Sequence, residues 1–279
     1  MSLGYSVRPA RAPDLGGTDD DIVHALATDP DGTFLAHSSS GAEVGRAAGA
    51  VRGDTLQLVH LFVAEPARGR GVGRALFNAV RAYGVSRGAR NVEAFPPSGP
   101  AALAFLLRLG LPVRTLALRL RLEPADARTP ERAGETLVPV TADTALSGWV
   151  SDLDREIRGF SREKEWARWM RRPQGAVFAL KRRGRPEAVG ALRTSDAITV
   201  LGPIEGRTPA AAAALLESLF AGAGERKAGG LWLDVPAEAG LLLEAAFRSG
   251  FRLTESLPVF SSRPRGDLRR YVASGTAFF

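Results

Sequence analysis

The hydrophobic and polar positions along the chain predict one series of strands and helices that occurs twice. Residues 32–52 and 175–193 each predict two strands joined by a polar turn that contains glycine. Residues 92–111 and 233–251 each predict a strand that ends at a proline, an apolar helix and a turn with a second glycine. Because element order, spacing and turn residues agree in the two halves, we interpret the chain as a tandem duplication.

Each copy predicts the order strand, helix, two or three strands, helix, strand, helix and final strands, which is typical of an α/β (α+β) layered fold. The stretch between the copies is polar and is interrupted by Pro124 and Pro130, a composition typical of a linker. We therefore predict an N-terminal domain at residues 1–122, a linker at residues 123–136 and a C-terminal domain at residues 137–279.

The pattern most directly tied to chemistry is a glycine-rich turn between a strand and a helix. Residues 57–63 form an apolar run that predicts a buried strand, which Glu65 and Pro66 end. Residues 68–74 follow with the sequence Arg-Gly-Arg-Gly-Val-Gly-Arg, and an amphipathic helix comes next. Glycines let main-chain N–H groups approach a ligand, and a helix N-terminus favours negative charge. The three arginines add donors suited to phosphate oxygens, so the turn predicts a phosphate-binding site.

The spacing within this turn discriminates among phosphate-binding motifs. A Walker loop needs Gly-Lys-Ser/Thr, and a dinucleotide fingerprint needs a third glycine or alanine where this chain has arginine or leucine. The Arg-x-x-Gly-x-Gly pattern of Arg68, Gly71 and Gly73 follows a Phe62-Val63-x-x-Pro66 segment. Together these residues resemble the cofactor-binding core of the GNAT acyl-CoA transferase superfamily, and the resemblance extends over nearly the whole first half.

The resemblance implies acetyl-CoA as cosubstrate and, in each half, a mixed, mostly antiparallel central sheet flanked by helices. The main chain of Leu61, Phe62 and Val63 would hydrogen-bond the pantetheine arm like an added strand. The pyrophosphate would be held by seven residues, Arg68, Gly69, Arg70, Gly71, Val72, Gly73 and Arg74. The acetyl carbonyl would lie in a V between the central strands, where an amine attacks it directly in a ternary complex.

The usual proton-transfer residues of the superfamily are missing from this sequence. Many members carry a carboxylate or histidine six residues before the valine that matches Val63, where this chain has Gln57. Many also carry a tyrosine four residues before the glycine that matches Gly110, where this chain has Leu106. Glutamine cannot act as a base and leucine cannot act as an acid, so other groups must be considered.

Two side chains near the V, those of Glu93 and Ser98, are candidates for proton transfer, and His60 is not. Glu93, at the end of a strand that forms the V, is the best carboxylate candidate, and the alternative is a half-exposed strand residue without a catalytic role. Ser98, in the following loop, is a weaker candidate. His60 lies an odd number of residues from Gln57, so strand alternation predicts that it faces the opposite side and packs between strand and helix.

The second copy keeps the scaffold but lacks the phosphate-binding turn. In the corresponding residues 199–209, Glu205 brings negative charge where a pyrophosphate would lie, and Pro209 lacks an N–H group. The segment that contains Asp154, Gly159 and Arg162 resembles a recurrent entry segment of the C-terminal GNAT-like domains in two-domain bacterial acetyltransferases. We expect one acetyl-CoA site per chain, with the second half either closing over the acceptor or covering a sheet edge as a structural partner.

Composition excludes several other kinds of site. The chain has no cysteine and three widely spaced histidines, so a disulfide, a thiolate nucleophile and a metal site are not expected. The net charge of +7 comes mainly from arginines spread along the chain, a pattern that does not favour nucleic-acid binding. No apolar run approaches the roughly 20 residues of a membrane span, and no secretory signal is recognised. We therefore expect a cytoplasmic protein without a membrane partner.

These patterns predict an acetyl-CoA-dependent N-acetyltransferase that moves an acetyl group to an amine of a small molecule or a peptide. The missing base and tyrosine leave a second interpretation open, a catalytically weak or inactive acyl-CoA-binding sensor. The sequence does not identify the acceptor, and it does not distinguish a monomer from a homodimer.

Overall fold

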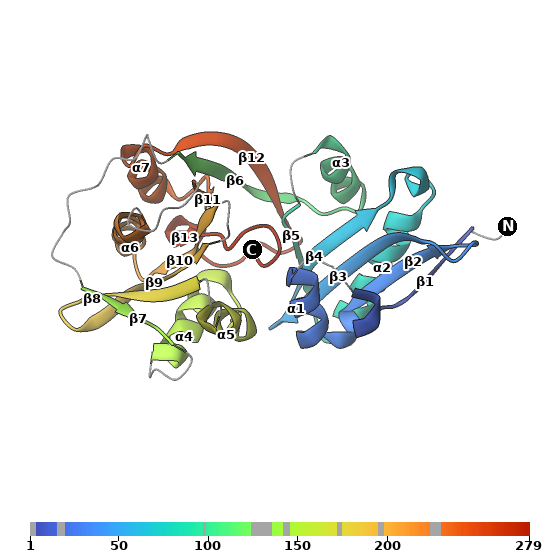
Figure 1. The fold of residues 1–279 in the computed structure, drawn as a ribbon, viewed down its shortest axis with the longest axis horizontal. Helices are drawn as coiled ribbons and strands as arrows, with labels where there is room; N and C mark the ends of the chain where they lie inside the picture. The colour runs from blue at the N-terminus through green and yellow to red at the C-terminus, as the bar shows by residue number, and fades with distance from the viewer. Residues whose placement is uncertain are drawn as a thin grey trace. The chain divides into compact units, whose positions relative to one another are not determined.

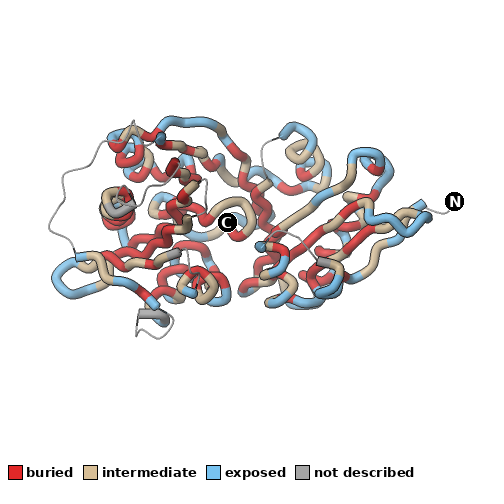
Figure 2. Tube along the Cα trace, in the orientation of Figure 1, coloured by how far each residue is buried: buried red, intermediate tan, exposed pale blue. Residues whose placement is uncertain are grey.

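The computed structural model of the chain describes residues 4–15, 20–96, 99–123, 136–141, 146–171, 175–194, 198–223 and 230–279. These residues form two compact units (Figure 1). Unit 1 comprises Met1–Phe95 and Phe260–Arg263, and unit 2 comprises Pro96–Val259 and Pro264–Phe279. In each unit the buried positions follow the strands of a central sheet (Figure 2).

Unit 1 contains a mixed sheet in the order β1-β2-β3-β4-β5-β12. The β4–β5 pair is parallel, and the pairs on either side of it are antiparallel. The strands are β1 (Tyr5–Pro9), β2 (Thr33–Ser38), β3 (Glu43–Arg52), β4 (Thr55–Val63), β5 (Asn91–Ala94) and the end of β12 (Arg252–Ser261). The helices are α1 (Asp20–Thr28), α2 (Val72–Ser86) and the short 3-10 turns η1 (Ala12–Leu15), η2 (Pro30–Gly32) and η3 (Glu65–Ala67).

Helix α2 packs on one face of this sheet because glycines on β3 make room for it. A Cβ atom on Gly49 would lie 2.5 Å from Val80 of α2, and one on Gly45 would lie 3.0 Å from Leu76. Side chains alternate between the two faces of a strand. The odd-numbered positions of β3 therefore face α2, and the even-numbered positions face the other side of the sheet.

In unit 2 the strand order is β12-β6-β11-β10-β9-β8-β7, with β13 paired to β10. The strands are β6 (Val113–Leu122), β7 (Thr136–Pro139), β8 (Gly175–Arg182), β9 (Arg185–Thr194), β10 (Thr199–Gly206), β11 (Leu231–Pro236), the first part of β12, and β13 (Tyr271–Val272). The helices are α3 (Pro100–Arg108), α4 (Leu146–Arg158), α5 (Glu163–Arg171), α6 (Pro209–Ala223), α7 (Gly240–Arg248) and η5 (Leu268–Arg270). The β10–β11 pair is parallel, like β4–β5 in unit 1.

The predicted duplication is visible in the way that helices α3 and α7 end. Gly110 and Gly250 follow these helices with φ angles of +77° and +97°. The next N–H group in each copy donates back to the helix, from Leu111 to the oxygen of Leu106 at 3.2 Å and from Phe251 to that of Ala246 at 3.1 Å. This bonding closes a helix C-terminus and needs a left-handed residue. The predicted α/β class, with mixed sheets flanked by helices in two copies, is confirmed.

Each copy lends a strand to the other unit. Strand β6, which follows the first copy in the sequence, pairs with β11 in unit 2 from Ala117 to Leu122. The end of β12, which belongs to the second copy, pairs with β5 in unit 1 through Phe260 and Ser261. Most of the predicted linker, residues 124–135, lies outside the described residues. The predicted domain boundaries of 1–122, 123–136 and 137–279 stay a prediction.

The longest helices among the described residues, α2 and α6, have 15 residues each, and none of the described helices is long and apolar enough to cross a bilayer.

A buried ion pair joins Asp29, the residue after helix α1, to Arg52 at the end of strand β3 in unit 1. Asp29 Oδ2 accepts a hydrogen bond from Arg52 Nη1 at 2.6 Å, and Asp29 Oδ1 accepts from Val51 N–H and the Tyr83 hydroxyl. Burial by itself would raise the pKa of Asp29, but the charge of Arg52 and these hydrogen bonds lower it below its ordinary value.

We expect Asp29→Asn to lower the free energy of unfolding by about 2 kcal/mol at pH 7, because charge-assisted hydrogen bonds are lost around a buried guanidinium. A carboxylate with a lowered folded pKa stabilises the fold above its ordinary pKa, and this contribution is lost as the pH falls through the folded value. The difference between wild type and variant in urea unfolding should therefore be constant from pH 7 to 5 and shrink below about pH 4. The exposed Asp31, changed to Asn, is the control; an equal loss in both variants would contradict the role of Asp29.

Candidate functional site

Strand β4 leads into the glycine-rich turn and is covered on only part of one edge. Along its first edge it pairs with β3 from Thr55 to Val63. Along its second edge it pairs with β5 from Thr55 to Leu58, and among the described residues no strand pairs with this edge beyond Leu58. We call residues 59–63 on this side the uncovered edge of β4. An extended ligand can add to a sheet along an edge of this kind.

The predicted pantetheine-binding residues lie on this uncovered edge. Leu61 and Val63 are half-buried, whereas the Phe62 side chain is 50% exposed. The chain then passes through η3, and the next residue, Arg68, donates from Nε to the main-chain oxygen of Val63 at 3.1 Å. This hydrogen bond ties the end of β4 to the start of the turn, so edge and turn form one continuous surface.

The turn itself presents main-chain donors at the N-terminus of α2. Gly69 and Gly71 have φ angles of +73° and +87°, in the left-handed region that glycine adopts most easily. Gly71 is the N-cap of α2 and supplies no side-chain hydrogen bond to it. The first main-chain bond of the helix runs from Ala75 N–H to the oxygen of Gly71 at 3.0 Å. The N–H groups of Val72, Gly73 and Arg74 precede it and, as at any uncapped helix start, have no partner within the helix.

This arrangement fits a diphosphate group. The turn residues Arg68, Gly69, Arg70 and Gly71 are exposed, as is Arg74, while Val72 is buried and anchors the turn. Donor groups at a helix start, open glycines and three flanking guanidiniums are the features that bind phosphate oxygens in proteins. The ligand contacts of residues 61–63 and 68–74 stay a prediction.

A row of buried polar side chains crosses three strands next to this edge. Gln57 on β4 is paired in register with Glu93 on β5, and Glu93 is paired with Ser261 on β12. Residues paired in this way share one face of a sheet. Glu93 is only 3% exposed, and Ser261 Oγ lies 3.5 Å from its carboxylate oxygen Oε1. The predicted candidate Glu93 is therefore a buried member of a polar row, and not a half-exposed strand residue.

The segment that supplies Ser261 is fixed by Asn91 at the start of β5. Asn91 Oδ1 accepts hydrogen bonds from Ser261 Oγ at 3.2 Å, Ser262 Oγ at 2.9 Å and Arg263 N–H at 2.8 Å. All four residues belong to unit 1, although about 170 positions separate Asn91 from the others. Sequence reasoning missed Ser261, because no local pattern indicates a pairing over such a separation.

The prediction for His60 is wrong, and a β-bulge is the reason. On β3, Gly49 pairs with Leu58 and its neighbour Ala48 pairs with His60, which leaves Val59 as an extra residue on β4. A bulge of this kind shifts the alternation of the strand by one position. Gln57 pairs with Ala50 and His60 with Ala48, two residues apart on β3. His60 therefore lies on the same face as Gln57, the face opposite α2, and it is half-buried.

The other two positions considered for proton transfer are Ser98 and Leu106. Ser98 lies outside the described residues. Leu106 is a buried residue of α3 and fills an apolar position. Within the described ranges, no group of three or more His, Asp or Glu side chains is placed to hold a metal ion.

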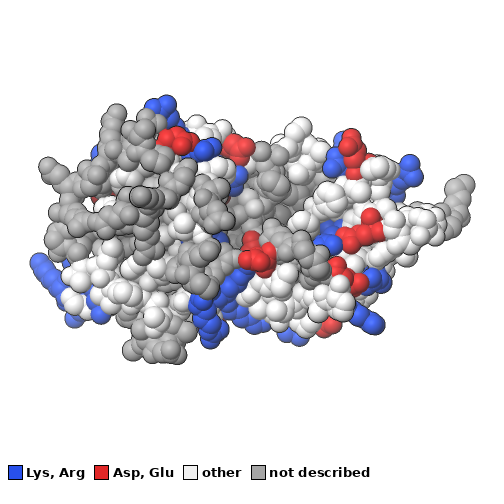
Figure 3. Space-filling model, in the orientation of Figure 1, with Lys and Arg blue, Asp and Glu red and all other residues white. Residues whose placement is uncertain are grey.

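Charged side chains on the surface are mixed in sign. On the face shown in Figure 3, Lys and Arg lie in several separate groups with acidic side chains among them. Several arginines are paired with carboxylates, including Arg8 with Asp14 at 2.8 Å and Arg46 with Glu43 at 3.0 Å. That nucleic acid is not a partner stays a prediction.

Comparison with known families supports two related domains. The model described as the acetyltransferase (GNAT) family matches residues 6–111, and the model described as an acetyltransferase (GNAT) domain matches residues 150–265. Together the two matches cover more than half of the chain. No curated protein matches the sequence.

Solved structures share the fold at low sequence identity. A Pyrococcus horikoshii protein provisionally described as an acetyltransferase aligns with a TM-score of 0.77 at 17% identity, covering 99% of this chain and 96% of its own. A GCN5-related N-acetyltransferase from Sphaerobacter thermophilus aligns with a TM-score of 0.63 at 16% identity, covering 97% and 99%. A tandem GNAT protein from the clavulanic acid biosynthesis pathway gives 0.61 at 19% identity, covering 88% of each chain. At these identities the likeness shows the fold alone.

Proposed function

This chain is a tandem protein of the GNAT superfamily, and we propose that it is an acetyl-CoA-dependent N-acetyltransferase with its cosubstrate site in unit 1. Membership of this superfamily indicates an acyl transfer reaction in general. The proposal adds that the acyl donor is acetyl-CoA and that the acceptor is an amine of a small molecule or a peptide. It also adds that the amine attacks directly in a ternary complex.

The observation that carries the proposal is the continuity of the uncovered edge of β4 with the open turn before α2. Residues 61–63 would hydrogen-bond the pantetheine arm as a strand would, and residues 68–74 would hold the pyrophosphate. The extended arm and the diphosphate of one ligand need these two surfaces side by side.

Side chains of unit 1 would accept the proton that the acceptor amine loses. The thioester supplies an activated acetyl group, and an amine must lose a proton to attack it. Glu93 and His60 share the face opposite α2 with Gln57, and each has a side chain able to accept that proton. The Gln57 amide, paired in register with Glu93, would orient the amine beside it.

We expect one of the two variants Glu93→Gln and His60→Gln to lose most of its activity, which would identify the residue that acts as the base. Loss of the base should lower kcat by about 100-fold. Thiol release with a panel of amines would measure kcat, and calorimetry should show acetyl-CoA binding unchanged. Glu43→Gln, on the exposed start of β3, is the control that keeps the wild-type rate. Wild-type turnover in both test variants would refute the assignment of these two residues.

A sensor is the second candidate function, and the side chains at two positions favour it. Gln57 and Leu106 stand where many superfamily members have a base and a tyrosine, and both are buried. Acetyl-CoA binding without thiol release on any amine of the panel would support the sensor over the enzyme.

A further inference from the structure

The parallel strands of unit 2 separate after a short paired stretch, as those of unit 1 do. Strands β10 and β11 pair only at Thr199 with Leu231 and at Val200 with Trp232. Beyond Val200, β10 continues to Gly206 with an irregular register against β9, as β4 does against β3 after Leu58. The edge of β10 beyond Val200 is therefore the counterpart of the uncovered edge of β4.

A distant segment of the chain covers this edge in unit 2. Strand β13 pairs antiparallel with β10, Tyr271 with Glu205 and Val272 with Ile204 (Figure 1). The next residue, Ala273, donates its N–H to the main-chain oxygen of Asp234 on β11 at 2.9 Å. The segment thus bonds to both parallel strands, and Tyr271, Val272 and Ala273 are fully buried.

We infer that residues 271–279 occupy, in unit 2, the position that the pantetheine arm would take in unit 1. An extended peptide and a pantetheine arm both present amide groups to a strand edge, so either can complete the sheet. The second copy is then closed from within by its own chain. The comparison with unit 1 rests on the proposed function, whereas the placement of the segment does not.

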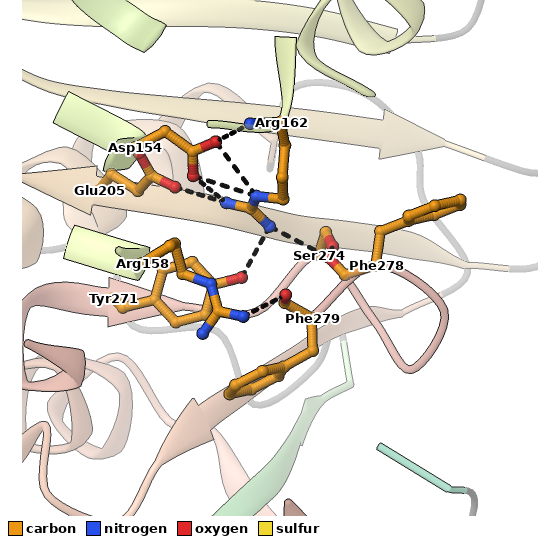
Figure 4. A network of polar contacts seen from close by, with 8 residues as sticks. All are labelled: Asp154, Arg158, Arg162, Glu205, Tyr271, Ser274, Phe278 and Phe279. Carbon is orange, nitrogen blue, oxygen red and sulfur yellow. Dashed lines mark hydrogen bonds and ion pairs between the residues drawn. The ribbon is translucent and has the colours of Figure 1, made fainter. Parts of the chain in front are cut away.

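A buried polar network holds the segment in place (Figure 4). Arg162 Nη1 donates to the Tyr271 hydroxyl at 2.9 Å and to the main-chain oxygen of Phe278 at 3.0 Å. Arg158 donates to the main-chain oxygen of Phe279. The same Arg162 is paired with Asp154 at 2.7 Å and Glu205 at 2.5 Å, so the segment is part of a network of charged groups inside unit 2.

The start of α6 is closed as well. Thr208 Oγ1 accepts the N–H of Ala211 at 3.1 Å, so a side chain caps this helix where Gly71 leaves α2 open. Glu205, just before it, is fully buried, and burial together with the Asp154 carboxylate raises its pKa well above the ordinary value. Neither feature offers a diphosphate the donors that the turn of unit 1 offers.

Gly202 on β10 shows how closely the segment approaches. A Cβ atom at this position would overlap the main-chain oxygen of Ala273. Any side chain at residue 202 therefore competes with the segment for the same space, which provides a way to displace it.

Hydrogen exchange of the full-length protein tests the inference directly. We expect the amides of residues 271–273 to exchange as slowly as those of β10, with no change when acetyl-CoA is added. Exchange of residues 271–273 at the rate of an unstructured chain would overturn the inference. Acetyl-CoA should slow exchange at residues 59–63 at least tenfold; failure of that result alone would count against the proposed function and not against the closed second copy.

The variant Gly202→Ala should speed exchange across residues 271–279 at least tenfold. Gly99→Ala is the matched control, because Gly99 has nearly the same φ, +156° against +154°, and has nothing within 4 Å of an added Cβ. It lies in the same unit and should leave the exchange of residues 271–279 unchanged. Equal exchange in wild type and Gly202→Ala would overturn the inference, as would a calorimetric stoichiometry of two acetyl-CoA per chain.

Discussion

Replacing Gly71 by aspartate is expected to weaken acetyl-CoA binding by about 1000-fold while leaving the fold of unit 1 in place. The new carboxylate would stand at the N-terminus of α2, where the proposed diphosphate lies. Two unit charges about 4 Å apart repel by roughly 4 kcal/mol at an effective dielectric constant of 20, and each 1.4 kcal/mol is a tenfold change in Kd. The positive φ of +87° adds local strain, and an added Cβ would meet the Tyr5 hydroxyl at 3.3 Å.

Strain and charge at the site can be separated with a second glycine. Gly41, in the turn between β2 and β3, has a φ of +83° and no atom within 4 Å of an added Cβ. Gly41→Asp therefore carries the same charge and a similar backbone conformation away from the site. Calorimetry should show wild-type affinity for this variant, with circular dichroism unchanged in both. If Gly71→Asp bound acetyl-CoA as tightly as Gly41→Asp, the turn would not be the diphosphate site.

Replacing Arg162 by methionine is expected to lower the free energy of unfolding of the protein by about 3–5 kcal/mol, the usual cost of breaking a buried ion pair. The guanidinium lies between the carboxylates of Asp154 and Glu205, and all three side chains are fully buried. Without it, two acidic groups would remain in a medium that solvates charge poorly. Urea unfolding followed by tryptophan fluorescence reports on this region, since Trp166 and Trp169 lie on the adjoining α5.

The control for this experiment is Arg155 on helix α4. Its ion pair with Asp152 spans 2.8 Å, but the two side chains are 55% and 76% exposed. Exposed pairs contribute little to stability, so Arg155→Met should leave the urea midpoint where it is. A loss below about 1 kcal/mol for Arg162→Met would contradict the view that this arginine balances the buried carboxylates.

The fold and the turn could be predicted because their signals are local. Strand and helix periods, the prolines and the glycines after α3 and α7 lie within short windows of sequence, and they repeat. The turn is a pattern of Arg68, Gly71 and Gly73 within six residues, and the left-handed φ of Gly71 is what such a pattern requires.

The catalytic face could not be predicted in the same way, because long-range register determines it. Strict alternation predicts that His60 faces the side of the sheet opposite Gln57. Only the pairing of β4 with β3 reveals the extra residue, Val59, which reverses that prediction. Ser261 lies beside Glu93 because β12 pairs with β5, which no pattern near residue 93 or residue 261 indicates. The sequence shows the acidic residue Glu205 but not its partner, Arg162, with which it forms a buried ion pair.

The pairing of β6 with β11 and of β12 with β5 has a consequence for the history of the gene. Once each copy completes its sheet with a strand encoded in the other, neither half can be lost or transferred alone without exposing an unpaired strand edge, which invites aggregation. The second copy could then lose its ligand-binding turn and still be retained by selection for folding. A duplicated gene that began as two separable units would in this way have become indivisible.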